Sequence, residues 1–289
     1  AELERYIDWG PFFQTWDLAG SFPAILQDAT VGAHAREVYA EGRAMLERLI
    51  AEHWLTANAS VGFYPANSVG EDIEVYADES RDKLLFTWRG LRQQNRKPVV
   101  DGVAVPNRAL ADFVAPKASG IADYIGLFAV TAGIGIEARE AVFAQTHDDY
   151  SAIMLKSLAD RLAEAYAELM HERVRKDLWG YAPHESLAND ELIAEAYRGI
   201  RPAPGYPACP DHRVKRALFD ILPTQAIGME LTESFAMTPA AAVSGFYFSH
   251  PASTYFSVGR IGRDQLDDLA AREGAEASEL ERWLASSLG

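Results

Sequence analysis

A proline-rich segment in the second half of the chain strongly limits what this sequence can fold into. Residues 198–212, RGIRPAPGYPACPDH, hold four prolines and two glycines in fifteen positions. Proline lacks an amide donor and fixes φ, and glycine accepts backbone angles that a Cβ forbids, so a regular helix or a central strand is excluded. We predict a stiff, extended loop between two helical segments, with Tyr206 at its middle. Rigid loops often carry binding groups, although a purely structural connector could have the same composition.

Composition and charge narrow the class of protein. The 289 residues are 48% hydrophobic, which supports one large domain or two modest ones. The net charge of -15 argues against a general nucleic-acid binder. The single cysteine, Cys209, excludes an intramolecular disulfide and a thiolate-rich zinc site, and it fits a reducing, cytoplasmic setting. We find no apolar run of about 18 residues and no signal peptide, so we expect no membrane span. The start at Ala1 suggests a module excised from a longer protein.

The spacing of apolar residues predicts the elements. Residues 1–30 are irregular and aromatic, and we expect an extended arm that wraps the body of the domain. Helices are predicted near 32–56, 148–178, 190–198, 210–222, 264–273 and 277–287. Strands are predicted near 60–66, 72–77, 83–88, 121–132, 227–231, 241–249 and 254–261. Strands and helices do not alternate strictly, so we predict an α+β fold: a single large domain with a mainly antiparallel twisted sheet flanked by helices.

Two short motifs suggest other kinds of site. Residues 133–138 match GxGxxA at a strand-to-helix turn, but a dinucleotide site also needs a second parallel strand that ends in an acidic residue. The next acidic pair, Asp148 and Asp149, begins a long helix instead, and either residue could cap it. Glu168 and His171 match the ExxH of di-iron bundles, without a second ExxH. We expect these two side chains on a solvated helix face.

The remaining polar and aromatic groups suit ligand recognition better than catalysis. No P-loop, HExxH, GxSxG or CxxC motif occurs, and Cys209 has no base beside it. Arg201 could bind a carboxylate through two hydrogen bonds. Negative charge for an ammonium group could come from Asp8, Asp160 and Glu164. Aromatic faces could come from Tyr206, Tyr255 and Phe256. S-adenosylmethionine (AdoMet) combines a carboxylate, an ammonium, a heteroaromatic ring and a sulfonium, and would match this set.

A series of longer segments, in order over essentially the whole chain, carries a family resemblance. They are YIDW at 6–9, PFF at 11–13, HDDY at 147–150, ADRLAEA at 159–165, HERVR at 171–175, WGY at 179–181, the loop 198–212, LTESFAM at 231–237, SHP at 249–251, RDQ at 263–265 and ERWL at 281–284. The chain closely resembles the C-terminal activation (AdoMet-binding) domain of cobalamin-dependent methionine synthase. The most specific part is Arg201 followed by Gly205 and Tyr206.

The resemblance implies a function that spacing alone does not show. Such a domain, here residues 1–289 with the arm at 1–30, binds AdoMet and supports the reductive methylation of cob(II)alamin to methylcobalamin, with an electron from flavodoxin or a similar flavoprotein. It works as part of methionine synthase (5-methyltetrahydrofolate–homocysteine methyltransferase). This chain lacks a DxHxxG cobalamin motif and the homocysteine and folate modules, so cobalamin would be bound mainly by another module. The domain itself would position and shield the reactants.

The resemblance also implies site residues. The cofactor contacts would be Asp8, Glu164, Arg201, Ala203, Gly205, Tyr206, Tyr255 and Phe256. Glu164 would lie near the ligand ammonium, the backbone at Ala203 and Gly205 would hold the adenosyl part, and Tyr206 would face the corrin. Asp160 matches a docking position rather than a ligand contact. Phe256 stands where some relatives have a tyrosine. No side chain is implied as a catalyst or a metal ligand.

The expected flavoprotein partner raises a question of charge, because flavodoxins are themselves acidic. Docking on a chain of net charge -15 would need a local basic patch. The candidates are Arg173, Arg175, Lys176, Arg213, Lys215 and Arg216. Two other classes stay open at the level of sequence. One is a stand-alone Rossmann-type AdoMet methyltransferase that uses Gly133 and Gly135. The other is an interaction module with a vestigial ligand pocket.

Overall fold

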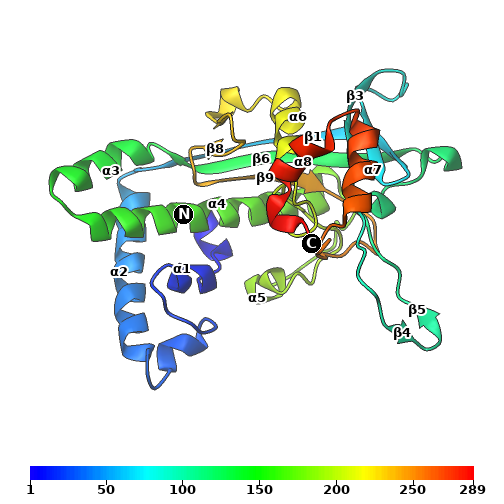
Figure 1. Ribbon diagram of the computed structural model, residues 1–289. Helices are drawn as coiled ribbons and strands as arrows, with labels where there is room; N and C mark the ends of the chain where they lie inside the picture. The colour runs from blue at the N-terminus through cyan, green and yellow to red at the C-terminus, as the bar shows by residue number, and fades with distance from the viewer. The chain divides into compact units, whose positions relative to one another are not determined.

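Five strands form the central sheet of the computed structural model, which describes residues 1–289 apart from the side chains of Val100 and Val103. Across the sheet the order is β3 (Leu84–Trp88), β2 (Asp72–Tyr76), β1 (Thr56–Val69), β6 (Asp123–Ile134) and β9 (Ala242–Tyr247). The strands run antiparallel, with Ala66 opposite Val75 in the β1–β2 pair. Strand β6 is buried from Ile125 to Gly133, as its continuous apolar run predicts. The predicted α+β class is confirmed (Figure 1).

The chain divides into two compact units built from alternating stretches of sequence. The first consists of Ala1–Ala59, Val130–Tyr197 and Thr224–Val243, and the second of Ser60–Ala129, Arg198–Pro223 and Ser244–Gly289. Three of the five boundaries fall inside β1, β6 and β9, and the other two, after Tyr197 and after Pro223, lie between elements. Neither unit is therefore a continuous segment that composition could reveal.

Long helices dominate the first unit. They are α2 (Gly32–Ala51), α3 (Ile136–Gln145) and α4 (Asp149–Arg173), followed by a π-helical turn at Val174–Leu178 and by α5 (Asn189–Ile193). The Asp148 carboxylate accepts a hydrogen bond from the Ser151 amide at 3.0 Å, so Asp148 is the cap of α4. This bond lowers the pKa of Asp148. Helix α3 folds back beside α4 (Figure 1).

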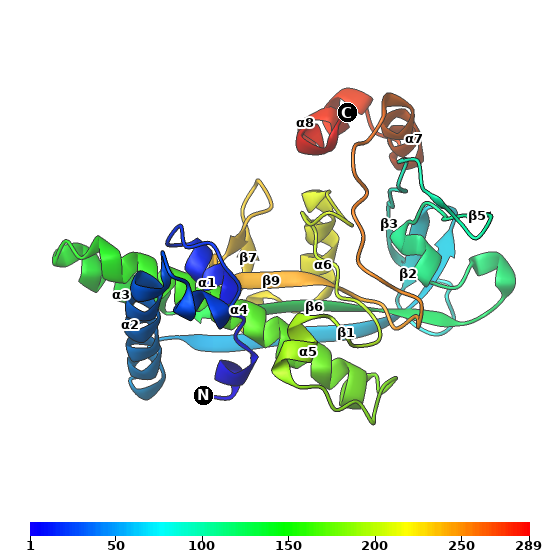
Figure 2. The ribbon, with the colours of Figure 1, turned by 90° about the horizontal axis from the view of Figure 1, so that it is seen from below.

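The N-terminal arm contains short helices where we expected an extended chain. They are η1 (Glu2–Tyr6), α1 (Gly10–Gln14) and η2 (Ala24–Gln27), and the first two lie against α4 (Figure 2). Buried Trp9, Phe12 and Phe13 are spaced for one face of a helix. A Cβ on Gly42 of α2 would lie 2.6 Å from Phe12 Cζ, so this glycine admits the ring. Aromatic burial thus gives the arm its helical turn.

The smaller elements complete the two units. The first also holds η7 (Gln225–Ile227), β7 (Glu230–Leu231) and β8 (Met237–Thr238). The second holds β4 (Val99–Val100), β5 (Val103–Ala104), η3 (Leu110–Phe113), η4 (Lys117–Ser119), η6 (His212–Val214), α6 (Lys215–Ile221), α7 (Arg263–Glu273), α8 (Ala277–Trp283) and η8 (Ala285–Ser287). No helix among the described residues is both long and apolar enough to span a membrane.

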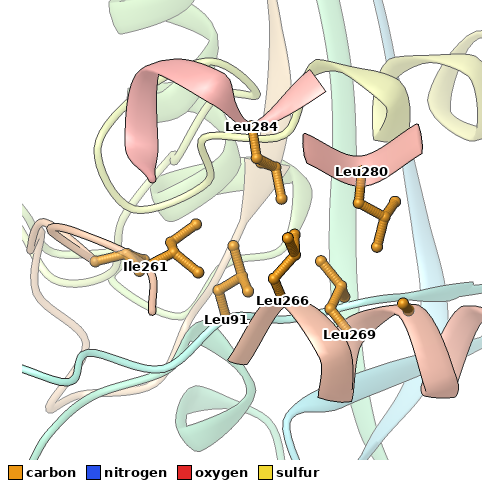
Figure 3. Packing of buried hydrophobic residues seen from close by; sticks show 8 residues of the cluster. Leu91, Ile261, Leu266, Leu269, Leu280 and Leu284 are labelled. Carbon is orange, nitrogen blue, oxygen red and sulfur yellow. The ribbon is translucent and has the colours of Figure 1, made fainter. Parts of the chain in front are cut away.

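The strand predicted at 254–261 is wrong. Its amides bond to loops instead of a neighbouring strand: Val258 donates to the Pro207 carbonyl at 2.8 Å and Ile261 to the Ser287 carbonyl at 2.8 Å. The apolar residues that suggested a strand are anchored in a core formed with α7 and α8. In Figure 3 the side chains of this core point toward one another: Leu91, Ile261, Leu266, Leu269, Leu280 and Leu284.

Candidate functional site

The proline loop is present and lies along the outer edge of β9. Ile200 and Phe248 exchange two backbone hydrogen bonds of 3.1 and 3.0 Å, and the Phe246 amide donates to the Pro202 carbonyl at 3.0 Å. A Cβ on Gly245 would lie 2.5 Å from that carbonyl, so only glycine permits the approach. Sequence analysis did not single out Gly245; its place inside a strand pattern was the available signal. Residues 200–202 of the loop are thus hydrogen-bonded to the edge of the sheet as an additional strand would be.

Beyond Pro202 the loop closes into a tight turn. The Tyr206 amide donates to the Ala203 carbonyl at 3.1 Å, the Cys209 amide to the Tyr206 carbonyl at 2.9 Å, and the Gly205 amide to the Cys209 carbonyl at 2.7 Å. Gly205 has a φ of 95°, in the left-handed region that disfavours other residues. Ala203 is buried, whereas Tyr206 is 54% exposed. The turn presents an aromatic ring on an ordered backbone.

Two of the predicted ligand contacts meet in the structure. The Arg201 amide donates to the Tyr255 hydroxyl at 3.0 Å, which fixes the backbone from which the guanidinium projects. The neighbouring Phe256 ring packs against Phe113, with centroids 6.4 Å apart, and against the core of Figure 3. We had expected only an aromatic face from Tyr255. Its hydroxyl has a supporting role that spacing could not reveal, because 54 positions separate the partners.

The predicted acidic residues belong to the first unit. The Asp8 carboxylate accepts a hydrogen bond from the Gly10 amide at 2.8 Å and so shapes the start of α1. Asp160 and Glu164 lie one turn apart on α4, with Asp160 exposed and Glu164 half-buried. The surrounding protein partly desolvates the Asp160 carboxyl and the nearby charge of Glu164 adds repulsion, so the pKa of Asp160 is raised.

Glu168 and His171 are buried, which contradicts the predicted solvated face. Glu168 is 7% exposed and His171 is fully buried. A buried arginine explains the position of Glu168: Arg175 lies 3.8 Å from the Glu168 carboxylate and 2.7 Å from that of Glu185. Its guanidinium also lies 4.3 Å from the centre of the Tyr197 ring. The His171 ring packs edge-on against the same Tyr197 ring, with centroids 4.8 Å apart, so the ExxH pattern reflects internal packing.

The proposed basic patch is wrong for half of its members. Arg175 is fully buried and Lys215 is 6% exposed. Arg213 is held between two carboxylates, at 2.6 Å from Asp211 and 2.9 Å from Glu273. Cations that are buried, or held between two carboxylates, are poorly placed to offer charge to a partner. Arg173 and Lys176 each have one ion pair, with Glu2 and Glu172 at 3.1 Å, and are more exposed. The exposed or half-buried candidates that remain are Arg173, Lys176 and Arg216.

The structure also settles the other motif residues. Burial raises the pKa of the Cys209 thiol well above its ordinary range, so the thiol stays protonated and unreactive. Gly135 begins α3, and α4 follows without a second strand, so the GxGxxA motif lacks its βαβ context. A Cβ on Gly133 would lie 2.8 Å from Pro239, which gives this glycine a packing role. Among the described residues, no cluster of three or more His, Cys, Asp or Glu side chains could hold a metal ion.

An antiparallel sheet with a rigid loop on its edge defines an α+β domain, a different class from the parallel-sheet dinucleotide-binding proteins. Residues 1–274 match the family described as the activation domain of vitamin B12-dependent methionine synthase, and the chain belongs to this family. A solved structure of the MetH reactivation domain bound to AdoHcy is similar, with 54% identity and a TM-score of 0.91. The match covers 99% of this chain and 87% of that chain.

Proposed function

We propose that this chain is the reactivation domain of a cobalamin-dependent methionine synthase. It binds AdoMet and supports the reductive methylation of cob(II)alamin to methylcobalamin, with an electron from flavodoxin or a similar flavoprotein. The observation that carries the proposal is the 54% identical reactivation domain bound to AdoHcy. AdoHcy is what remains of AdoMet after its methyl group has left, so a pocket that holds one fits the other.

The loop supplies the groups that would orient the ligand. Arg201 binds the carboxylate through its guanidinium, and the Tyr255 hydroxyl holds the backbone from which that side chain projects. The backbone at Ala203 and Gly205 lies against the adenosyl part, with Phe256 as an aromatic wall. From the first unit we propose Asp8 and Glu164 as contacts of the ammonium group. We assign no acid or base, because methyl transfer from a sulfonium requires no proton transfer.

Cobalamin, when bound, supplies the cobalt that accepts the methyl group. The exposed ring of Tyr206 fits a flat macrocycle, because the closed turn beneath it presents an apolar face without further ordering. The residues of this chain hold and shield the donor, and the cobalamin module comes from elsewhere in the enzyme. Arg173, Lys176 and Arg216 are the cations we propose for contact with an acidic flavoprotein. A cytoplasmic setting fits the reduced Cys209 and a reduced flavoprotein partner.

Calorimetry with AdoMet and AdoHcy on the 289-residue chain tests the proposal. We expect both ligands to bind, and we expect Arg201→Ala to weaken AdoMet binding roughly 10- to 100-fold, because two charge-assisted hydrogen bonds are lost. Arg198→Ala is a matched control: this arginine of the same loop donates to the Ser249 carbonyl at 3.0 Å, and its loss should leave the affinity nearly unchanged.

Two results would overturn the assignment. Absence of AdoMet binding by the unmodified chain would favour an interaction module with a vestigial pocket. Equal affinities for the Arg201→Ala variant and the unmodified chain would remove Arg201 as the anchor. Gly135→Val does not test the Rossmann alternative cleanly, because a Cβ at Gly135 would lie 2.9 Å from the Trp54 carbonyl oxygen and would strain the fold.

A further inference from the structure

An imidazole ring lies directly behind the turn that carries Tyr206. A Cβ built on Gly205 would lie 2.1 Å from His212 Cε1 and 2.6 Å from Nε2. The ring therefore occupies the space into which any other residue at position 205 would project. The Gly205 amide donates to the Cys209 carbonyl at 2.7 Å, which holds the backbone of the turn in place beside the ring. The shape of the turn depends on the place of this ring.

The ring is held by a buried lysine. Lys215 Nζ lies 3.0 Å from His212 Nδ1, and Lys215 is only 6% exposed. An ammonium group has only donors, so the bond requires an imidazole that is neutral at Nδ1 and carries its proton on Nε2. A second proton on the ring would place an N–H and a positive charge against the lysine. The neutral ring is the form that the surroundings select.

The other charged groups around the pair do not reverse this preference. Burial and the charge of Lys215 lower the pKa of His212, while Asp211 acts weakly in the opposite direction. The Asp211 carboxylate is itself engaged by Arg213, which also binds Glu273 of α7. Burial lowers the pKa of Lys215, and the nearby Cys209 acts in the opposite direction without reversing the shift.

We propose that His212 is a positioning residue for the AdoMet-binding loop, and that its neutral ring, anchored by Lys215, keeps the Gly205–Tyr206 turn in the shape that binds. The proposal rests on the function proposed above. It follows that binding depends on pH. Because the intact turn holds fewer protons than a disordered one, its stability is complete above about pH 6.5 and falls as the pH decreases toward the lowered pKa of His212.

Three variants distinguish the roles of the hydrogen-bond acceptor at Nδ1, the space that the ring fills and the protonation of His212. His212→Asn keeps an oxygen near the position of Nδ1 but cannot be protonated, so its AdoMet affinity should not change between pH 7.0 and 5.5. His212→Phe fills the space without an acceptor and should bind about tenfold more weakly at pH 7, because the lysine loses a hydrogen bond in a buried site. His34→Asn changes an exposed histidine of α2 and should keep the pH profile of the unmodified chain.

The measurements are calorimetry with AdoMet from pH 7.0 to 5.5, a range in which the ligand ammonium stays charged, and NMR of the ligand-free chain. The unmodified chain should lose several-fold in affinity over this range, and the Gly205 amide shift should follow the titration of the His212 ring. Two results would overturn the proposal. One is that His212→Asn loses AdoMet affinity with falling pH as the unmodified chain does, and the other is that His212→Phe binds AdoMet as tightly as the unmodified chain at pH 7. If the unmodified chain bound no AdoMet, the proposed function would fail, and the Gly205 amide titration would still decide the role of His212.

Discussion

Gly205 shows how one residue controls the binding loop. It combines a φ of 95° with an imidazole ring 2.1 Å from the place of a Cβ. Gly205→Ala should therefore destabilise the chain by about 2–3 kcal/mol and abolish detectable AdoMet binding. Gly274→Ala is the matched control, since its φ of 68° is similar but no atom lies within 4 Å of its Cβ. The control should cost only about 1 kcal/mol. Urea unfolding compares the two, and equal losses would contradict the argument.

At the residue scale, the sequence indicated a rigid loop around groups that lie close together in the chain. Arg201, Gly205 and Tyr206 are recognisable because the prolines around them exclude helix and strand. The Tyr255 hydroxyl was missed because its bond to Arg201 spans 54 positions, and no local pattern records such a contact. His212 was missed for a different reason. A histidine in a helix-opening segment has no spacing that reveals a glycine packed against its ring.

The end of α4 shows the same limit at the scale of an element. The helix was predicted correctly from its apolar stripe, because long periodic segments carry a strong signal. The placement of Glu168 and His171 was wrong, since their partners lie beyond the helix: Arg175, on the following π-helical turn, pairs with Glu168, and the Tyr197 ring packs against His171. The strand predicted at 254–261 was wrong because alternating apolar residues can also anchor an irregular segment on a core. The spacing of apolar residues thus predicts which side chains are buried more reliably than it predicts which backbone segments pair as strands.

The buried network at this end of α4 allows a stability prediction. Arg175→Met keeps the volume but leaves the Glu168 and Glu185 carboxylates buried without their cation, which should cost about 3–5 kcal/mol. Arg173→Met, at an exposed position two residues earlier with a surface pair to Glu2, should change stability by less than about 1 kcal/mol. Thermal and urea unfolding measure both. A small loss in the Arg175 variant would mean that the carboxylates reach water or take up protons.

At the scale of the whole molecule, the composition bounded the class but not the organisation. The order of predicted strands and helices led to an α+β fold, which is confirmed. The two interleaved units could not be foreseen, because three of their five boundaries lie inside continuous strands, where no change of composition marks them. The expected basic patch was wrong for Arg175, Arg213 and Lys215 for a similar reason: counting cations does not show which of them are buried or held between carboxylates inside the fold.

Docking of this chain on its partners involves the whole molecule, and substitution of Asp160 tests the docking role predicted for that residue. In the full enzyme, Asp160→Ala should leave AdoMet affinity nearly unchanged and slow flavodoxin-dependent reactivation several-fold, because an exposed carboxyl with a raised pKa suits a partner contact rather than an internal pair. Asp149→Ala, an exposed aspartate on the first turn of the same helix, is the control. Reactivation is followed by the recovery of methylcobalamin absorbance. A lowered AdoMet affinity in the Asp160 variant would make this residue a ligand contact instead.

The pairing of the proline loop with β9 affects how substitutions in the loop change the solubility of this chain. Strand β9 is the last in the sheet, and an uncovered last strand invites other chains to add to it. Ile200 and Pro202 occupy backbone groups of Phe246 and Phe248 there, and the prolines that follow offer no amide to continue the ladder. The loop that we propose to bind the ligand therefore also protects this edge of the sheet against aggregation. Substitutions that loosen it should lower solubility as well as affinity, so loss of activity in loop variants must be judged on protein that remains monomeric.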